Sequence, residues 1–336
     1  MGAPCADSRL GFLGRLRDAC GSGALPLLGQ WELTCRCNLN CVMCYTDPFN
    51  TPGRIRRELA TPEILRILGE LRDAGCLELC LTGGEPLARP DFIGIYTRAK
   101  ELGFLLTLFT NGTLITPKVA DHLKRYTPRM IEISFHGMTR ASFDGITQGP
   151  GSYDRCREGI RLLLERGLPL TIKTLGMTVN RDEVREIKAW AGGLAGVQYQ
   201  FGSVLRPRLD GATDADRIQL PVEEVRRIER ADAQFRAERR LQDRRYRRSL
   251  RRDGVRCGGG RFRFHIDAYG QLSLCSENRR QGYDLRSGSF REGFFAALPG
   301  FPCPNRCPAA PTDAERDTHA AQALAARPQT VPGGPP

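Results

Sequence analysis

The chain has 336 residues, of which 40% are hydrophobic, 26% charged and 7% aromatic, as in a globular protein of about two domains. Of its net charge of +12, residues 225–252 carry +8, with twelve arginines and four acidic residues. No run approaches the ~18 apolar residues of a membrane-spanning helix, and the first residues lack the order of a secretory signal. We therefore expect a cytoplasmic protein with no membrane partner.

Short apolar runs alternate with amphipathic stretches between residues 30 and 205. The predicted strands are 31–36, 76–82, 104–110, 130–136, 168–175 and 196–203. The predicted helices lie near 61–74, 90–102, 116–126, 152–166 and 181–192. Six strands separated by helices imply right-handed βαβ crossovers and a parallel sheet. Since eight such units would close a full barrel, six predict a partial (β/α)6 TIM-like barrel, an α/β fold.

Alternation within these strands predicts a polar lumen. Leu79 and Leu81 share one face of the second strand, while Cys80 and Thr82 share the other. Ser134 lies on the corresponding polar face of the fourth strand. The helices should cover the leucine face, so the polar face should line a cavity for a polar substrate. A half-exposed strand is the alternative interpretation.

The rest of the chain divides by composition. Residues 206–220 are rich in Asp, Gly and Pro and read as a linker, and one long arginine-rich helix is predicted over 221–252. That helix is interpreted as a solvated connector or as a docking site for an acidic peptide. Its few aromatic residues argue against nucleic acid as a partner. The predicted segments are an N-terminal extension (1–29), the barrel (30–205), the linker and helix (206–255), a small Cys-rich domain (256–310) and a flexible tail (311–336).

Thirteen cysteines are the unusual feature of the composition. An odd number in a leaderless chain argues against a disulfide framework and favours metal or redox chemistry. Three of them follow the first predicted strand with the spacing C-x3-C-x2-C: Cys37, Cys41 and Cys44. Three thiolates on one short loop can wrap an iron–sulfur cluster or a zinc ion, and the missing fourth ligand leaves a coordination position for substrate.

This cysteine spacing, placed after the first strand of a partial barrel, resembles the radical S-adenosylmethionine (SAM) superfamily. The resemblance implies that Cys37, Cys41 and Cys44 bind three irons of a [4Fe–4S] cluster and that SAM chelates the fourth. An electron from the cluster then cleaves SAM to methionine and a 5′-deoxyadenosyl radical, which abstracts a substrate hydrogen. A reducing partner such as ferredoxin or flavodoxin would supply the electron. Met43 stands where the family has an aromatic residue on the adenine side.

A second set of residues strengthens the resemblance. The second strand ends in a turn that is similar to the Gly-Gly-Glu-Pro motif with which the family holds the methionine amino group of SAM: Gly83, Gly84, Glu85 and Pro86. By resemblance, Ser134 contacts SAM, and Thr110 and Lys173 contact substrate or SAM. A strand-end turn is the alternative for Thr110, and a solvated tip is the alternative for Lys173. Cys80 on the lumen face is a candidate hydrogen-atom donor to a radical, and packing in the core is the alternative.

The C-terminal cysteines form a second group. A predicted hairpin turn at 267–270 would return Cys275 towards Cys257, and Cys303 and Cys307 lie further on. Four thiolates can close the shell of a structural or electron-relay cluster, and zinc is the alternative. The hairpin resembles the SPASM/twitch extensions of radical SAM enzymes, which implies an auxiliary [4Fe–4S] cluster on these four cysteines.

Taken together, the resemblance implies a radical SAM enzyme of the oxidoreductase, transferase or lyase type. SPASM/twitch relatives often modify ribosomally made peptides, so the leading expectation is a peptide- or protein-modifying enzyme. A radical SAM enzyme acting on a small metabolite or on RNA is one alternative. A non-catalytic iron–sulfur or electron-transfer protein is the other.

Overall fold

The structure is a computed structural model that describes residues 24–46, 52–209, 214–252, 258–279 and 281–303. These residues fall into two compact units. The first unit runs to Leu220 and resumes at Gly258, and the second holds the helices that follow Pro221. Within the described residues, no helix is long and apolar enough to cross a lipid bilayer. Cys257 and Cys307 lie outside them, as do 1–23 and 304–336.

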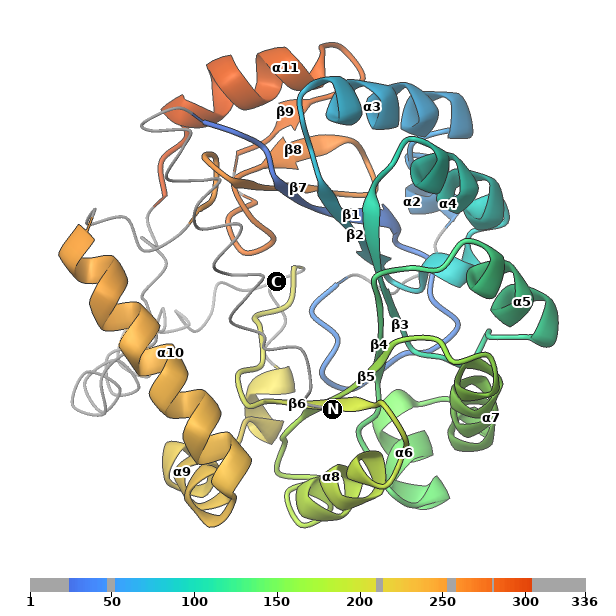
Figure 1. Cartoon of the computed structure of the whole chain (residues 1–336), viewed down its shortest axis with the longest axis vertical. Coiled ribbons are helices and arrows are strands. Elements are labelled where there is room, and N and C mark those ends of the chain that lie inside the picture. Colours follow the sequence, from blue (N-terminus) through green and yellow to red (C-terminus); the bar gives the residue numbers. More distant parts are fainter. Residues whose placement is uncertain (1–23, 47–51, 210–213, 253–257, 280, 304–336) are drawn as a thin grey trace, which may run out of the picture. The chain divides into compact units, whose positions relative to one another are not determined.

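The described residues of the first unit form one nine-stranded sheet (Figure 1). Its strands are β1 (Leu28–Thr34), β2 (Glu78–Gly83), β3 (Leu105–Thr110), β4 (Met130–Ser134), β5 (Leu170–Leu175), β6 (Gln198–Gly202), β7 (Arg263–Ile266), β8 (Gln271–Ser273) and β9 (Tyr283–Asp284). Their spatial order is β6-β5-β4-β3-β2-β1-β7-β8-β9, and all pairs from β6 to β7 are parallel. This curved parallel sheet confirms the predicted partial barrel.

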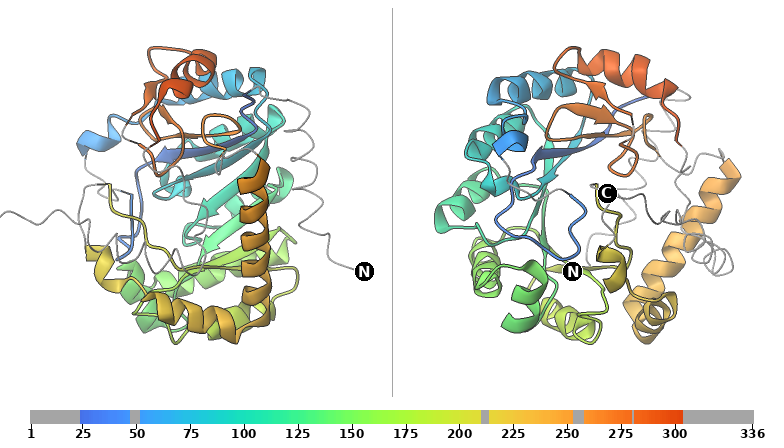
Figure 2. Two further views of the ribbon diagram at one scale, coloured as in Figure 1. Left: turned by 90° about the vertical axis from the view of Figure 1, so that its left-hand side faces the viewer. Right: turned by 180° about the vertical axis from the view of Figure 1, so that it is seen from behind.

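Helices connect the parallel strands and cover one face of the sheet (Figure 2). They are α2 (Pro52–Ile55), α3 (Thr61–Asp73), α4 (Phe92–Glu101), α5 (Pro117–Arg125), α6 (Arg140–Thr147), α7 (Ser152–Glu165) and α8 (Val184–Gly192). Two of them, α2 and α6, are absent from the sequence prediction. Helix α6 begins after Thr139, whose hydroxyl accepts a hydrogen bond from the backbone NH of Ser142 at 3.1 Å. That cap satisfies an NH with no partner inside the helix.

The core lies between the sheet and these helices. Leu79, Leu81, Ile131 and Ile133 have no exposed surface, as period-two alternation predicts for the helix-facing side. Helix α3 adds four buried aliphatic side chains to the core, Ile64, Ile67, Leu68 and Leu71. Burying each such side chain contributes about 1.5–3 kcal/mol, which fixes the register of the strands and hence the face that lines the lumen.

The second unit differs from its prediction. The expected single helix over 221–252 is two helices, α9 (Val222–Ala231) and α10 (Ala233–Arg252). Asp232 between them has extended backbone dihedrals, and its Oδ1 accepts hydrogen bonds from the NH groups of Gln234 (2.9 Å) and Phe235 (3.1 Å). Aspartate at this position caps a new helix and so interrupts the old one.

The C-terminal segment joins the barrel sheet. Strand β7 pairs in parallel with β1, on the edge of β1 opposite to β2, and β8 and β9 follow as antiparallel neighbours. The short helix α11 (Phe290–Glu292) packs against this edge: the rings of Phe264 and Phe290 are tilted to each other, with centroids 4.8 Å apart. Gly29 of β1 permits this contact, because a Cβ there would lie 2.5 Å from the Phe264 ring. Residues 258–303 thus continue the same sheet.

Candidate functional site

The loop after β1 carries three cysteines and has a defined conformation. Two backbone hydrogen bonds tie it to the end of α6, from Asn40 N to Thr147 O (3.0 Å) and from Val42 N to Ile146 O (2.9 Å). Met43, which the resemblance puts on the adenine side of SAM, packs against Ile146 in a small buried cluster. The three thiols that this loop presents are those of Cys37, Cys41 and Cys44.

Electrostatics make these thiols poor anions but good ligands for a cation. Burial raises the pKa of all three, to about 12 for Cys37, and the charge of Cys44 raises the pKa of Cys37 and Cys41 further. Two donors face the sulfur of Cys37: the backbone NH of Leu39 at 3.4 Å and the side-chain amide of Asn111 at 3.9 Å. Thiolates crowded in this way need the positive charge that bound iron supplies.

The donor set fits an iron–sulfur cluster. In the portion of the chain that the structure describes, no three His, Cys, Asp or Glu side chains are placed to hold a single metal ion. A cluster binds each cysteine to a different iron, so its ligands need not converge on one point. Three thiols, with two NH groups directed at the sulfur of Cys37, match that chemistry, since such hydrogen bonds tune cluster potentials.

Glu58 fixes the first residues of the cysteine loop and is a residue that the sequence analysis missed. Its Oε1 accepts hydrogen bonds from the hydroxyl of Thr34 (2.7 Å), the backbone NH of Cys35 (2.8 Å) and the thiol of Cys35 (3.0 Å). Arg36 lies 3.2 Å from its other oxygen. No motif surrounds Glu58, so nothing in the sequence marks a carboxylate that reaches the residues immediately before Cys37.

The Gly-Gly-Glu-Pro turn packs directly on this loop. Gly84 N donates to Thr34 O at 2.9 Å, and Glu85 N donates to Arg36 O at 2.7 Å. A Cβ on Gly83 would lie 2.2 Å from Thr34 O, and one on Gly84 would lie 2.3 Å from Arg36 O. The two glycines therefore allow two backbones to touch, one of which leads into Cys37. Gly83 also has φ +138°, which only glycine adopts readily.

Glu85 joins the end of β2 to the end of β3. Its fully buried carboxylate accepts hydrogen bonds from Thr110 Oγ1 (2.8 Å), Asn111 N (2.7 Å) and Leu87 N (3.1 Å). Burial raises the pKa of Glu85 to about 7 despite these donors. Pro86 begins a short 3-10 helix, Pro86–Ala88, capped by the same carboxylate. The structure thus brings Thr110 and the Gly-Gly-Glu-Pro turn together around one buried acid.

The lumen face carries an ion pair. Lys173 Nζ of β5 lies 2.9 Å from Glu132 Oε1 of β4 and 5.3 Å from the centroid of the Phe109 ring of β3. Ser134 is the register partner of Lys173 across the two strands. Burial raises the pKa of the nearby Cys80 thiol, and Glu132 adds to that effect. The sequence does not indicate that Glu132 pairs with Lys173, because strand register decides which side chains meet across the sheet.

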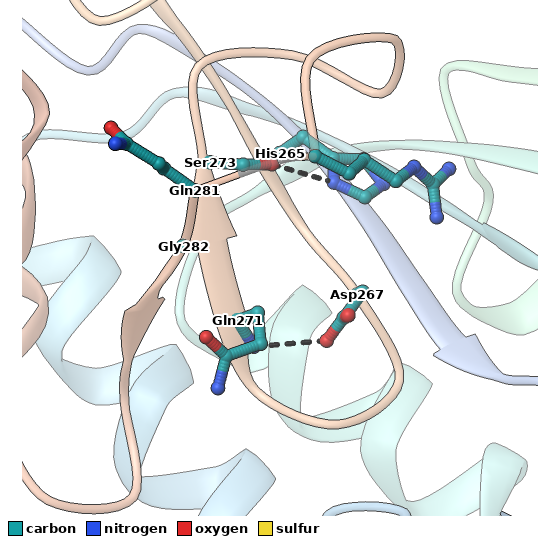
Figure 3. Close-up of a pocket in the computed structure, with 7 residues that line it drawn as sticks. His265, Asp267, Gln271, Ser273, Gln281 and Gly282 are labelled. Atoms are coloured by element: carbon teal, nitrogen blue, oxygen red, sulfur yellow. Dashed lines mark hydrogen bonds between the residues drawn. The ribbon is translucent and has the colours of Figure 1, made fainter. Parts of the chain in front are cut away.

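The C-terminal strands present a polar pocket of about 180 Å³ (Figure 3). Ser273 Oγ lies 3.2 Å from Nδ1 of the buried His265, and Asp267 accepts a hydrogen bond from the NH of Gln271 at 2.9 Å. Arg279 also lines this pocket. Its lining is polar because β7 and β8 turn their alternate side chains to the same face as the barrel lumen.

Two of the four C-terminal cysteines are described, Cys275 and Cys303, and both are partly exposed. Asn278, three residues after Cys275, donates to the carbonyl of Pro302 at 2.9 Å, next to Cys303. Gly260, three residues after Cys257, sits where a Cβ would lie 2.5 Å from the Leu274 side chain, next to Cys275. Within the described residues, the segments that contain Gly260, Cys275 and Cys303 therefore lie close to one another.

Fold and site together define a class: a partial-barrel protein with three cysteines on the loop after its first strand. Residues 31–191 match the family model of the radical SAM superfamily. These residues, just under half of the chain, are therefore a radical SAM domain. Proteins of this superfamily use a [4Fe–4S] cluster and SAM, and solved neighbours of this fold contain bound SAM.

Individual relatives are similar over part of their length. The AdoMet-dependent heme synthase of Methanosarcina barkeri is 34% identical over 174 residues, which are 52% of this chain and 49% of that protein. The PqqA peptide cyclase of Ruegeria pomeroyi is 34% identical over 159 residues, 47% of this chain and 42% of that protein. The chain thus spans about half the length of these curated relatives. Streptococcus suis SuiB, solved with its precursor peptide SuiA, has the same fold, with a TM-score of 0.64, 13% identity and coverage of 88% of this chain and 71% of SuiB.

Proposed function

We propose that this protein is a radical SAM enzyme whose Cys37, Cys41 and Cys44 hold a [4Fe–4S] cluster. When bound, the cluster supplies the electron that cleaves SAM to methionine and the 5′-deoxyadenosyl radical. One observation carries the proposal: the backbone that leads into Cys37 is hydrogen bonded to Gly84 and Glu85 of the Gly-Gly-Glu-Pro turn. A cluster site and a SAM-holding turn would thus form one rigid assembly at the ends of β1 and β2.

The surrounding residues have distinct tasks in this proposal. Leu39 N and the Asn111 amide donate to the Cys37 sulfur and stabilise its thiolate. Glu85 does not reach the loop through its carboxylate, which is engaged with Thr110 and the Asn111 NH. Its part is to hold the turn against β3, which leaves the backbone of the turn to receive the SAM ammonium.

The lumen face of β4 and β5 is the proposed substrate wall. Ser134 and Lys173 lie side by side in register near the ends of their strands, where barrel active sites are built. The Lys173–Glu132 pair offers both signs of charge to a polar substrate. Phe109 beneath the ammonium adds an apolar surface that excludes water from the site of hydrogen abstraction.

We further propose that the substrate is a peptide or a protein segment. The sheet ends at β6 and β9, which do not pair with each other among the described residues, so the sheet stays open along one side. An open barrel can admit an extended chain that a closed barrel would exclude. A relative named as a peptide cyclase supports this assignment. The similarity to a heme synthase favours a small-molecule substrate as the second candidate.

An auxiliary [4Fe–4S] cluster on Cys257, Cys275, Cys303 and Cys307 is part of the proposal. It is supported by the approach of Asn278 to Pro302 and of Gly260 to Leu274. Its test is iron and sulfide analysis of a variant in which Cys37, Cys41 and Cys44 are replaced by Ala. About four irons per chain remaining in that variant would support an auxiliary cluster, while about one zinc would replace it by a structural zinc site.

The decisive experiment for the function is 5′-deoxyadenosine formation. Protein reconstituted anaerobically with iron and sulfide is mixed with SAM and dithionite, and the nucleoside is quantified against the Cys37, Cys41, Cys44→Ala variant. We expect product from the wild type alone. A wild type that binds no iron on these cysteines would refute the proposal. Added candidate peptides and iron porphyrins then distinguish the two substrate classes by the one that increases turnover and gains a mass change.

A further inference from the structure

Tyr45 directly follows Cys44, and three separate segments contact it. The guanidinium carbons of Arg206 and Arg279 lie 5.3 Å and 5.7 Å from the centroid of its ring. Its hydroxyl donates to Glu32 Oε1 of β1 at 3.4 Å, and its carbonyl accepts a hydrogen bond from Leu209 N at 3.0 Å. We call the side chains of Glu32, Tyr45, Arg206 and Arg279 the Tyr45 network.

A buried bidentate ion pair is the centre of this network. Both terminal nitrogens of Arg279 donate to the carboxylate of Glu32, one of them at 2.8 Å to Oε2. Arg279 Nε donates to Ser276 O at 2.7 Å, so the guanidinium has no freedom to turn away. Burial alone would raise the pKa of Glu32, but His265 and Arg279 lower it to about 2. The pair is therefore charged at neutral pH and spans 247 residues of sequence.

Arg206 links residues 203–209 to the segment that carries Arg279. Its NH1 donates to Ser276 Oγ at 2.8 Å, and its NH2 lies 3.2 Å from Glu277 Oε1. Residues 203–209 and 276–279 are therefore joined to each other as well as to Tyr45. Since Tyr45 is covalently bonded to Cys44, whatever fixes Tyr45 also limits the positions that the third cysteine can take.

We propose that Arg279 and Glu32 are positioning residues that hold Tyr45, and through it Cys44, in place for cluster binding. The inference rests on the proposed function in one respect, that the cysteine loop is a cluster site. It assigns to the segment after Cys275 a role in the first cluster site. That segment supplies the Arg279 guanidinium, which keeps Cys44, the third cysteine, in position. Within the network, Glu32 and Arg279 also place a balanced pair of charges beside the loop.

The first test uses cluster-free protein, so that it does not depend on the proposed function. Hydrogen–deuterium exchange is followed at the Leu209 amide, whose acceptor is the Tyr45 carbonyl, in the wild type and in Arg279→Gln. Because removing one partner of a buried ion pair strongly destabilises its surroundings, we expect exchange to accelerate by about tenfold or more. The matched control is Arg286→Gln, which breaks the more exposed Arg286–Glu63 pair of the same segment. Equal exchange in wild type, variant and control would overturn the proposal.

The double variant Glu32→Gln/Arg279→Gln separates the loss of positioning from general destabilisation, because it removes both charges of the pair and leaves neither buried without its partner. It should keep the melting temperature of the wild type and still accelerate exchange at Leu209, since neither amide can hold Tyr45 as the ion pair does. Arg279→Lys, which keeps the charge but loses the bidentate geometry, should lie between wild type and Arg279→Gln. A double variant that melts normally and exchanges like the wild type would refute the positioning role.

The second test measures how the charges of Glu32 and Arg279 change the midpoint potential of the cluster. In reconstituted protein, the midpoint potential is measured for the electron paramagnetic resonance signal that changes when SAM is added. Glu32→Gln leaves an uncompensated cation near the loop and should raise the potential, whereas Arg279→Gln leaves an anion and should lower it. The double variant should return towards the wild type. Shifts of the same sign in both single variants would overturn the inference. A wild type that takes no cluster would refute the proposed function and leave the exchange test decisive for the network.

Discussion

Gly84→Ala tests how the Gly-Gly-Glu-Pro turn and the cysteine loop are joined. The new Cβ would lie 2.3 Å from Arg36 O and 2.8 Å from Cys35 O, both backbone atoms that cannot rotate away. The two segments must separate by about 0.7 Å to reach even 3.0 Å, an overpacking that costs about 1–3 kcal/mol. The separation also stretches the Gly84–Thr34 and Glu85–Arg36 hydrogen bonds, each worth about 1 kcal/mol. We expect a loss of about 3 kcal/mol in the free energy of unfolding.

For a chain of 336 residues that loss corresponds to a melting temperature lower by about 4 °C, measured by circular dichroism. Gly69→Ala is the control, because a Cβ at that position in α3 meets no atom within 4 Å. It should leave the melting temperature unchanged or raise it slightly, since alanine favours the helix. The iron bound by Gly84→Ala after reconstitution should fall as well. If Gly84→Ala and Gly69→Ala have the same melting temperature, the proposed close packing of turn and loop is refuted.

Three further predictions concern stability. Burial lowers the pKa of His136 to about 3, below its unfolded value of 6.5, so the unfolded chain takes up the proton first and wild-type stability falls as pH drops below 6.5. His136→Asn removes this slope, and urea unfolding at pH 7 and 5 should show the wild type losing about 2 kcal/mol more than the variant. Thr110→Val leaves the Glu85 carboxylate short of a donor and should cost about 1–3 kcal/mol in urea unfolding, whereas a Glu85→Gln background should shrink that cost. Asp232→Ala removes a helix cap and should lower helical stability by about 1 kcal/mol by thermal circular dichroism; an unchanged melt would mean that the cap contributes nothing.

The barrel was predictable because its signals are local. Strands of period two and helices of period 3.6 alternate along the chain. A local signal also marks the start of α5, where Thr116 stands before Pro117 and caps the helix. Thr61 before Pro62 differs: it is the first residue of α3 rather than its cap, and its hydroxyl donates to Asp91. A hydroxyl can serve its own helix or a neighbour, and only the packing decides which.

Long-range partners could not be predicted. The spacing of Cys37, Cys41 and Cys44 marks a ligand loop in the sequence, but nothing local indicates that Glu58 anchors that loop or that Arg279 reaches Glu32 across 247 residues. The roles of the buried carboxylates Glu58 and Glu32 depend on partners that only the folded chain places beside them. The same holds for β7, whose four residues carry no sign that they pair with β1.

That pairing has a consequence for how the chain is made. Strand β1 leaves the ribosome early, but its second neighbour is not synthesised until Arg263–Ile266, more than two hundred residues later. Until then one edge of β1, with Trp31 in it, is an open template for aggregation. At about 5–20 residues per second, that edge stays unpaired for on the order of ten seconds or more. A nascent chain of this protein is therefore expected to depend on a chaperone that covers β1 until its distant partner arrives.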